Sequence, residues 1–144
     1  MKKLKEIKKT IKKGKHRNGY PLKLHFGKKK YIIEVTFDNS WVYCIGQPQD
    51  QINKLFGFGA LPFHHFFSRR YGAYYDDIVE RVRVYKYNYV MGKRIEEFVC
   101  FLSIGIPGRF EIESYYISVE LGPYFGGNVP APHDINFDIK VYEK

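Results

Sequence analysis

The chain has 144 residues, with 24 Lys or Arg against 15 Asp or Glu, which is enough for one domain with a sizeable core and too little for two. No apolar run approaches the ~18 residues of a membrane helix, and the Lys-rich start lacks the apolar stretch of a secretory signal. These exclusions predict a cytoplasmic protein without a membrane span.

The positive charge is concentrated at the start of the chain. Residues 1–30 hold 13 Lys or Arg and one acid, whereas residues 31–144 hold 11 Lys or Arg and 14 acids. We therefore expect a basic arm and linker over residues 1–19, followed by a β domain over residues 20–144.

Apolar residues in the arm recur at helical spacing, at Leu4, Ile7 and Ile11. This spacing predicts a short helix, although repulsion among the surrounding lysines equally allows a disordered arm. Either form would bind nucleic acid without sequence specificity, by neutralising phosphates. The lysines concerned are Lys2, Lys3, Lys5, Lys8, Lys9, Lys12 and Lys13.

The rest of the chain has the alternating pattern of strands separated by turns. Strands are predicted at residues 22–26, 30–37, 40–46, 54–59, 78–90, 94–104, 109–121 and 135–142. The segment 40–46 is apolar on both faces and is expected to be central, whereas the clean alternation of 135–142 indicates an edge or outer strand. About eight strands without βαβ spacing predict an all-β fold: a single antiparallel sandwich, jelly roll or small barrel.

The predicted strand at 78–90 carries an unusual face. Side chains alternate along a strand, so its guanidiniums and phenols should share one side, opposite Val82 and Val84. Such a face can stack on flat rings and bind anions. The residues are Arg81, Arg83, Tyr85, Tyr87 and Tyr89.

The run from Ser68 to Gly72 places two adjacent arginines beside a hydroxyl and a glycine. Because the planar guanidinium matches phosphate or carboxylate oxygens in pairs, Arg69 and Arg70 could cradle an anion. The alternative is that they form ion pairs with Asp76, Asp77 or Glu80.

The adjacent histidines His64 and His65 are the feature that suggests an enzyme. A histidine could act as a general base near neutral pH, for example in a nucleotide phosphodiesterase. However, no nucleophile with an orienting acid stands at recognisable spacing, so no catalytic residue is assigned. No Cys/His spacing indicates zinc, and Cys44 and Cys100 are expected to be buried free thiols.

The order of motifs over residues 54–94 resembles that of small uncharacterised proteins of bacteriophages and mobile elements. The motifs are Lys-Leu-Phe-Gly-Phe-Gly, His-His, Ser-Arg-Arg-Tyr-Gly and the tyrosine-rich run that ends at Gly92-Lys93-Arg94. The resemblance implies a phage or integrated-element origin, location in the host cytoplasm and action by binding, since some such proteins sequester nucleotide signals of host defence.

The sequence thus predicts a non-enzymatic protein that binds a small phosphate-bearing or aromatic ligand, such as a nucleotide, without a cofactor or metal. Guanidiniums would hold the anion and tyrosines the ring. The residues expected to bind are His65, Arg69, Arg70, Arg81, Arg83, Tyr85 and Tyr87.

Overall fold

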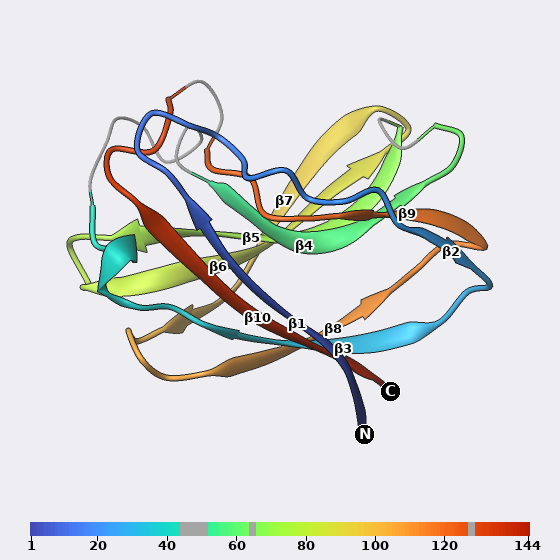
Figure 1. Cartoon of the computed structure of the whole chain (residues 1–144), viewed down its shortest axis with the longest axis horizontal. Helices are drawn as coiled ribbons and strands as arrows, with labels where there is room; N and C mark the ends of the chain where they lie inside the picture. Colours follow the sequence, from blue (N-terminus) through green and yellow to red (C-terminus); the bar gives the residue numbers. More distant parts are fainter. Residues whose placement is uncertain (44–51, 64–65, 127–128) are drawn as a thin grey trace.

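A computed structural model describes residues 1–43, 52–63, 66–126 and 129–144. Within these ranges ten strands form two antiparallel sheets that face each other, and the two chain ends lie close together (Figure 1). The predicted all-β class is confirmed, and the arrangement is that of a sandwich in which neither sheet closes on itself. The described residues contain no helix long and apolar enough to cross a membrane.

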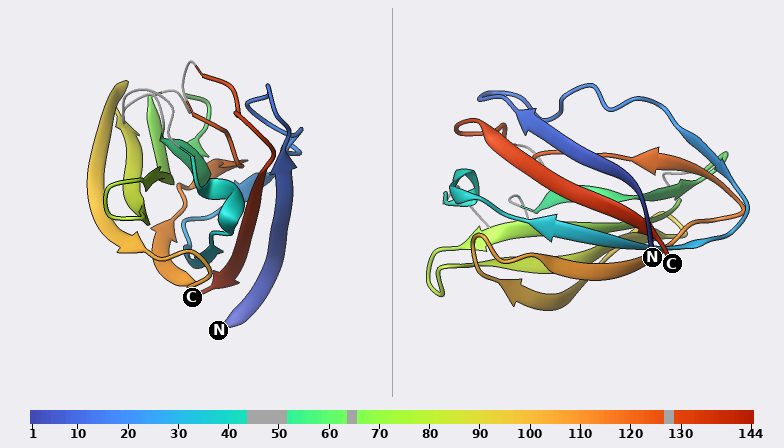
Figure 2. Two further views of the ribbon diagram at one scale, coloured as in Figure 1. Left: turned by 90° about the vertical axis from the view of Figure 1, so that its left-hand side faces the viewer. Right: turned by 60° about the horizontal axis from the view of Figure 1, so that its bottom comes forward.

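The four-stranded sheet has the order β1-β10-β3-β8, and all its neighbours are antiparallel. Figure 2 shows it as one layer of the molecule, facing the larger sheet. Its strands are β1 (Lys2–Ile11), β3 (Lys30–Thr36), β8 (Gly108–Glu113) and β10 (Ile135–Glu143).

The six-stranded sheet has the order β2-β9-β4-β5-β6-β7. β-bulges interrupt the register at Lys54/Phe56 in β4 and opposite Val84/Tyr85 of β6. Its strands are β2 (Leu24–Phe26), β4 (Asn53–Ala60), β5 (Phe67–Asp76), β6 (Arg81–Val90), β7 (Lys93–Leu102) and β9 (Ile117–Leu121).

The core lies between the sheets and is rich in aromatic rings. Trp41 is fully buried against Phe37 and Phe137, with ring centroids 4.6 and 5.0 Å away, and its Nε1 donates a hydrogen bond to the Asn136 carbonyl at 2.7 Å. Ring pairs of this kind add about 0.5–1.5 kcal/mol beyond the area that they bury. The buried indole therefore fixes the end of β10 against the segment after β3.

The expected N-terminal helix or disordered arm is wrong. Residues 2–11 form strand β1, which pairs with β10 from Lys2↔Glu143 to Ile11↔Ile135. Ile7 and Ile11 are only 4% and 0% exposed, because a four-residue spacing also places two side chains on one face of a strand. Residues 2–11 are therefore part of the sandwich and contribute to its core.

Three other strand predictions need correction. β10 is not an edge strand, because it pairs with β1 on one side and with β3 on the other. Its residues Ile135, Phe137, Ile139 and Val141 are buried on one face as expected. The segment 109–121 is two strands, β8 and β9, which lie in different sheets.

The predicted central strand at 40–46 is not observed in its described part. Residues Asn39–Trp41 form a short 3₁₀ helix, η1, capped by the Asp38 carboxylate, and the remainder from residue 44 lies outside the described residues. In β7 the bulge moves Phe98 away from Cys100 and Leu102, so Phe98 contacts Tyr85 on the opposite face. Cys100 is a half-buried free thiol, and Cys44 lies outside the described residues.

Candidate anion-binding site

The two faces of β6 divide as the sequence predicts. Val82 and Val84 are buried in the core between the sheets. The face with Arg83, Tyr85 and Tyr87 points away from the core and forms part of the outer face of the six-stranded sheet. The shared face of guanidiniums and phenols is therefore confirmed, and it is not the core face of the sandwich.

Arg69 and Arg70 do not cradle one anion together. They are neighbours within β5, so their side chains project to opposite faces of the sheet. Arg69 extends towards the four-stranded sheet, with its guanidinium 4.3 Å from the Tyr115 ring centroid and 3.7 Å from a Glu113 carboxylate oxygen. Arg70 alone belongs to the outer face, opposite Tyr87 of β6.

Gly57 gives the Arg70 side chain room to cross β4. A Cβ at Gly57 would lie 2.6 Å from Cγ of Arg70 and 2.0 Å from the Arg69 carbonyl oxygen. The absence of a side chain at Gly57 is therefore what permits this close approach. Crossing at this point, Arg70 donates a hydrogen bond of 2.8 Å from Nη2 to the Gly122 carbonyl oxygen.

Arg70 is half-buried, and its guanidinium has no carboxylate partner among the described residues. Its Nε has no hydrogen-bond partner among the described residues, and no ion pair to Arg70 occurs within them. Burial lowers the pKa of Arg70 to about 10, so the group remains charged at neutral pH. A buried charge without a counter-charge is costly, which makes Arg70 a strong candidate for holding an anion.

Lys54 of β4 is a second, half-buried cation, close enough to Arg70 for the two charges to repel each other. Its ammonium lies 4.8 Å from the Tyr87 ring centroid and 5.4 Å from that of Tyr124, and it donates a hydrogen bond of 2.9 Å to the Gly126 carbonyl oxygen. Burial, followed by repulsion from Arg70 and Arg94, lowers the pKa of Lys54 to about 8. The bulge at Lys54/Phe56 and the backbone bridge between Lys54 and Tyr124 fix this side chain on the outer face.

The charges around these two groups are unbalanced. Arg94 at the start of β7 lies near the Tyr87 ring and pairs with Glu96, with 2.8 Å between Nε and the carboxylate oxygen. Two cations, Arg70 and Arg94, and one acid, Glu96, act on the charge of Lys54. Together with the phenols of Tyr87 and Tyr124, this excess of positive charge suits an anion that carries a flat ring.

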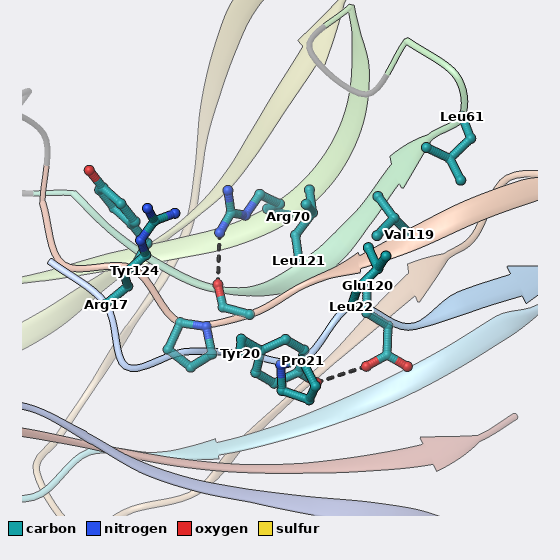
Figure 3. Close-up of a pocket in the computed structure, with 12 residues that line it drawn as sticks. Arg17, Tyr20, Pro21, Leu22, Leu61, Arg70, Val119, Glu120, Leu121 and Tyr124 are labelled. Atoms are coloured by element: carbon teal, nitrogen blue, oxygen red, sulfur yellow. Dashed lines mark hydrogen bonds between the residues drawn. The ribbon is translucent and has the colours of Figure 1, made fainter.

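A pocket of about 390 Å³ opens beside Arg70, within the size range of small-molecule sites. Its walls are the linker before β2, the β9 strand and the loop that follows β9 (Figure 3). Arg17 and Tyr124 lie at one end, and Leu61 and Val119 at the other. Gly122 allows this shape, since a Cβ there would lie 2.2 Å from the Tyr20 ring.

The other predicted ligand residues have different surroundings. Asp76 pairs at 2.6 Å with Arg83, and not with Arg69 or Arg70, whereas Arg81 stacks on Phe101 with 4.7 Å from its guanidinium carbon to the ring centroid. Tyr87 is buried beside Lys54, whereas Tyr85 stacks on Tyr74 further along the sheet. His64 and His65 lie outside the described residues.

Sequence reasoning missed a buried polar cluster around Glu120 of β9, which is only 4% exposed. The carboxylate contacts Lys5 Nζ and His25 Nε2, and it accepts a hydrogen bond of 2.7 Å from Tyr20 Oη. Burial alone would raise the pKa of Glu120, but the hydrogen bonds from Lys5, Tyr20 and His25 lower it. A single acid in the apolar run of 117–121 was the available signal for a buried ion pair.

Among the described residues no group of three or more His, Cys, Asp or Glu side chains is placed to hold a metal ion. A scan against protein-family models finds no match to the chain. Searches of curated proteins and of solved structures find no match either.

Proposed function

We propose that the protein binds a small anionic ligand with an aromatic ring, such as a nucleotide, in the pocket beside Arg70 and does not transform it. The observation that carries the proposal is the Arg70 guanidinium, whose Nε is buried without a hydrogen-bond partner, which has no carboxylate partner among the described residues and which lines a pocket of about 390 Å³. In this proposal the anion contacts Arg70 and Lys54, and the ring packs near Tyr124.

The resemblance to bacteriophage and mobile-element proteins gives this proposal a biological setting. A protein that binds a nucleotide without turning it over would act by lowering its free concentration. The proposed role is therefore sequestration of a host nucleotide signal in the cytoplasm.

Calorimetric titration of nucleoside phosphates, cyclic dinucleotides and sugar phosphates tests the proposal. Arg70→Gln should weaken binding of the best ligand by about tenfold or more, because a charge-assisted hydrogen bond contributes about 1.5–3 kcal/mol. The Gln side chain is too short to replace the hydrogen bond from Nη2 to the Gly122 carbonyl, but it removes the charge of a partly enclosed group, so the fold should be retained.

Arg109→Gln is the matched control, since Arg109 pairs with Glu34 at 3.0 Å on the four-stranded sheet, away from the pocket. This variant should bind like the parent protein. Equal loss of affinity in both variants, or no heat with any anionic ligand, would rule out the Arg70 pocket as the site.

A further inference from the structure

The outer face of β6 and β7 continues away from the Arg70 pocket as a row of rings and guanidiniums. Across the two strands Tyr85 is paired with Phe98 and Arg83 with Phe101. The Tyr85 and Phe98 rings meet edge to face at 5.6 Å, and Phe98 meets Phe101 at 5.1 Å. Arg81, the first residue of β6, stacks on Phe101 at the far end of the row.

Tyr85 packs against a small buried cluster of Ile52, Tyr74 and Tyr87 on this face, and the rings of Phe98 and Phe101 lie outside that cluster. Phe98 is 44% exposed, and Tyr85 and Phe101 are partly exposed. In the part of the chain that the structure describes, no strand or helix lies beyond β6 and β7 on this side (Figure 2). The solvated face of an antiparallel sheet is normally polar, so exposed aromatic side chains in a continuous row indicate a binding surface.

The charge of this face selects an anionic partner. Arg81, Arg83 and Arg94 lie on it, whereas its carboxylates are Asp76 and Glu96, which pair with Arg83 and Arg94. Arg81 has no ion pair within the described ranges. A guanidinium stacked on a ring also keeps N–H donors at its edge for phosphate oxygens.

We infer that this face binds single-stranded nucleic acid, with the Arg70 pocket holding one nucleotide and the following bases stacking along β6 and β7. This inference rests on the proposed function, which supplies the first nucleotide. From Tyr87, opposite Arg70, to Arg81 the strand advances about 20 Å. Stacking rings beside cations are the combination that single-stranded sites use, because an unpaired strand exposes both base faces and phosphates.

Other partners fit these observations less well. A duplex would present phosphates but keep its bases paired and stacked, so the row of rings would have no partner. A neutral carbohydrate could stack on the rings but would leave the arginines without anions. The geometry therefore favours an unpaired, negatively charged chain of aromatic units.

The test compares a nucleoside monophosphate with oligothymidine and oligouridine of about eight nucleotides, within the range of known single-stranded sites. Fluorescence anisotropy of labelled ligands titrated with the full-length protein should show that the oligonucleotides bind at least tenfold more tightly than the mononucleotide. The double variant Phe98→Ala, Arg81→Gln should bind the oligonucleotides about tenfold more weakly, since stacking of one base changes the affinity by about that factor. The same double variant should leave mononucleotide affinity unchanged.

Phe26→Ala is the matched control, since it removes a ring that is 70% exposed on β2, outside this face. A mononucleotide that binds through Arg70 as tightly as the oligonucleotides would overturn this inference and leave the proposed function standing. The inference would also be overturned if Arg70→Gln abolished binding of both ligand classes while the Phe98→Ala, Arg81→Gln double variant left oligonucleotide affinity unchanged. Equal affinity for duplex and single strand would also overturn it, and no binding of either ligand would remove both proposals.

Discussion

Lys54 reduces the stability of the folded protein at neutral pH. Its pKa in the folded protein is about 8, against an ordinary value of 10.5. Between these pH values the unfolded chain binds more protons, so Lys54 makes the free energy of unfolding rise with pH from about 8 to 10.5. Its full destabilising effect is present below pH 8.

Lys54→Met should therefore stabilise the unliganded protein by about 1 kcal/mol at pH 7, or about 2–4 °C in Tm, because it removes a buried charge with little change in volume. The rise in stability above pH 8 should be smaller in the variant, as measured by urea unfolding. Affinity for an anionic ligand should fall at pH 7 in the variant, and above pH 8 in the parent protein. Destabilisation together with unchanged affinity would show that Lys54 is a structural residue.

Glu120, in contrast to Lys54, stabilises the folded protein at neutral pH. Its hydrogen bonds from Lys5, Tyr20 and His25 lower its pKa in spite of burial. The stabilisation is therefore fully present above the ordinary carboxyl pKa of 4.5 and is lost as the pH falls through the lower folded pKa.

Glu120→Gln should cost about 3–5 kcal/mol at pH 7, because Lys5 loses its only counter-charge within the cluster. Denaturant unfolding from pH 3 to 7 should also show a weaker acid dependence in the variant. Glu6→Gln is the control, since the Lys3–Glu6 pair is solvent-exposed and should contribute little. Similar effects of the two substitutions would contradict the special role of the buried carboxylate.

At the scale of single elements, β1 is the strand whose contribution is most easily underestimated. It covers one edge of β10 and places Ile7 and Ile11 in the core. Ile11→Ala should destabilise the protein by about 2–5 kcal/mol, the usual cost of truncating a fully buried aliphatic side chain. Leu4→Ala is the control, because Leu4 is 41% exposed, and a thermal melt that ranks the two variants equally would contradict the observed packing.

The strands that sequence reasoning located are those in which apolar or aromatic side chains recur at every second position, such as β10 and β6. β1 was missed because lysines occupy both of its faces, and only its pairing with β10 shows that Ile7 and Ile11 are enclosed. The bulge in β7 moved Phe98 to the other face, and no local pattern announces an extra residue.

The candidate site was predictable only where it depends on the alternation of side chains along one strand. Alternation along β6 correctly placed Tyr87 with the arginines, but the separation of Arg69 from Arg70 required knowing that β5 is a strand. Lys54, Arg17 and Tyr124 meet Arg70 only through the pairing of β4 with β5 and the path of the loop after β9. Such contacts depend on tertiary structure, which the sequence pattern does not contain.

At the scale of the whole molecule, folding brings the basic start of the chain onto the acidic remainder. Lys5 pairs with Glu120, Lys12 with Asp134 and Lys28 with Glu113, at sequence separations of 85 to more than 100 residues. Part of the positive charge at the start of the chain is thus matched by acids of the remainder. It does not concentrate all the lysines of residues 1–13 on a single basic surface.

This arrangement bears on the alternative in which those lysines bind nucleic acid. As a strand, β1 distributes them over two faces, and a truncation of residues 1–17 would remove a strand of the sandwich along with the charge. The sharper experiment replaces the exposed Lys2, Lys8 and Lys13 with Gln in the full chain, where Lys8 already faces Asp138 across the strand pair. Because the proposed contacts lie on β6 and β7, oligothymidine affinity and its salt dependence should change little. If the lysines do contact phosphates, the slope of log affinity against log salt should instead become shallower by about 0.7 for each lysine lost.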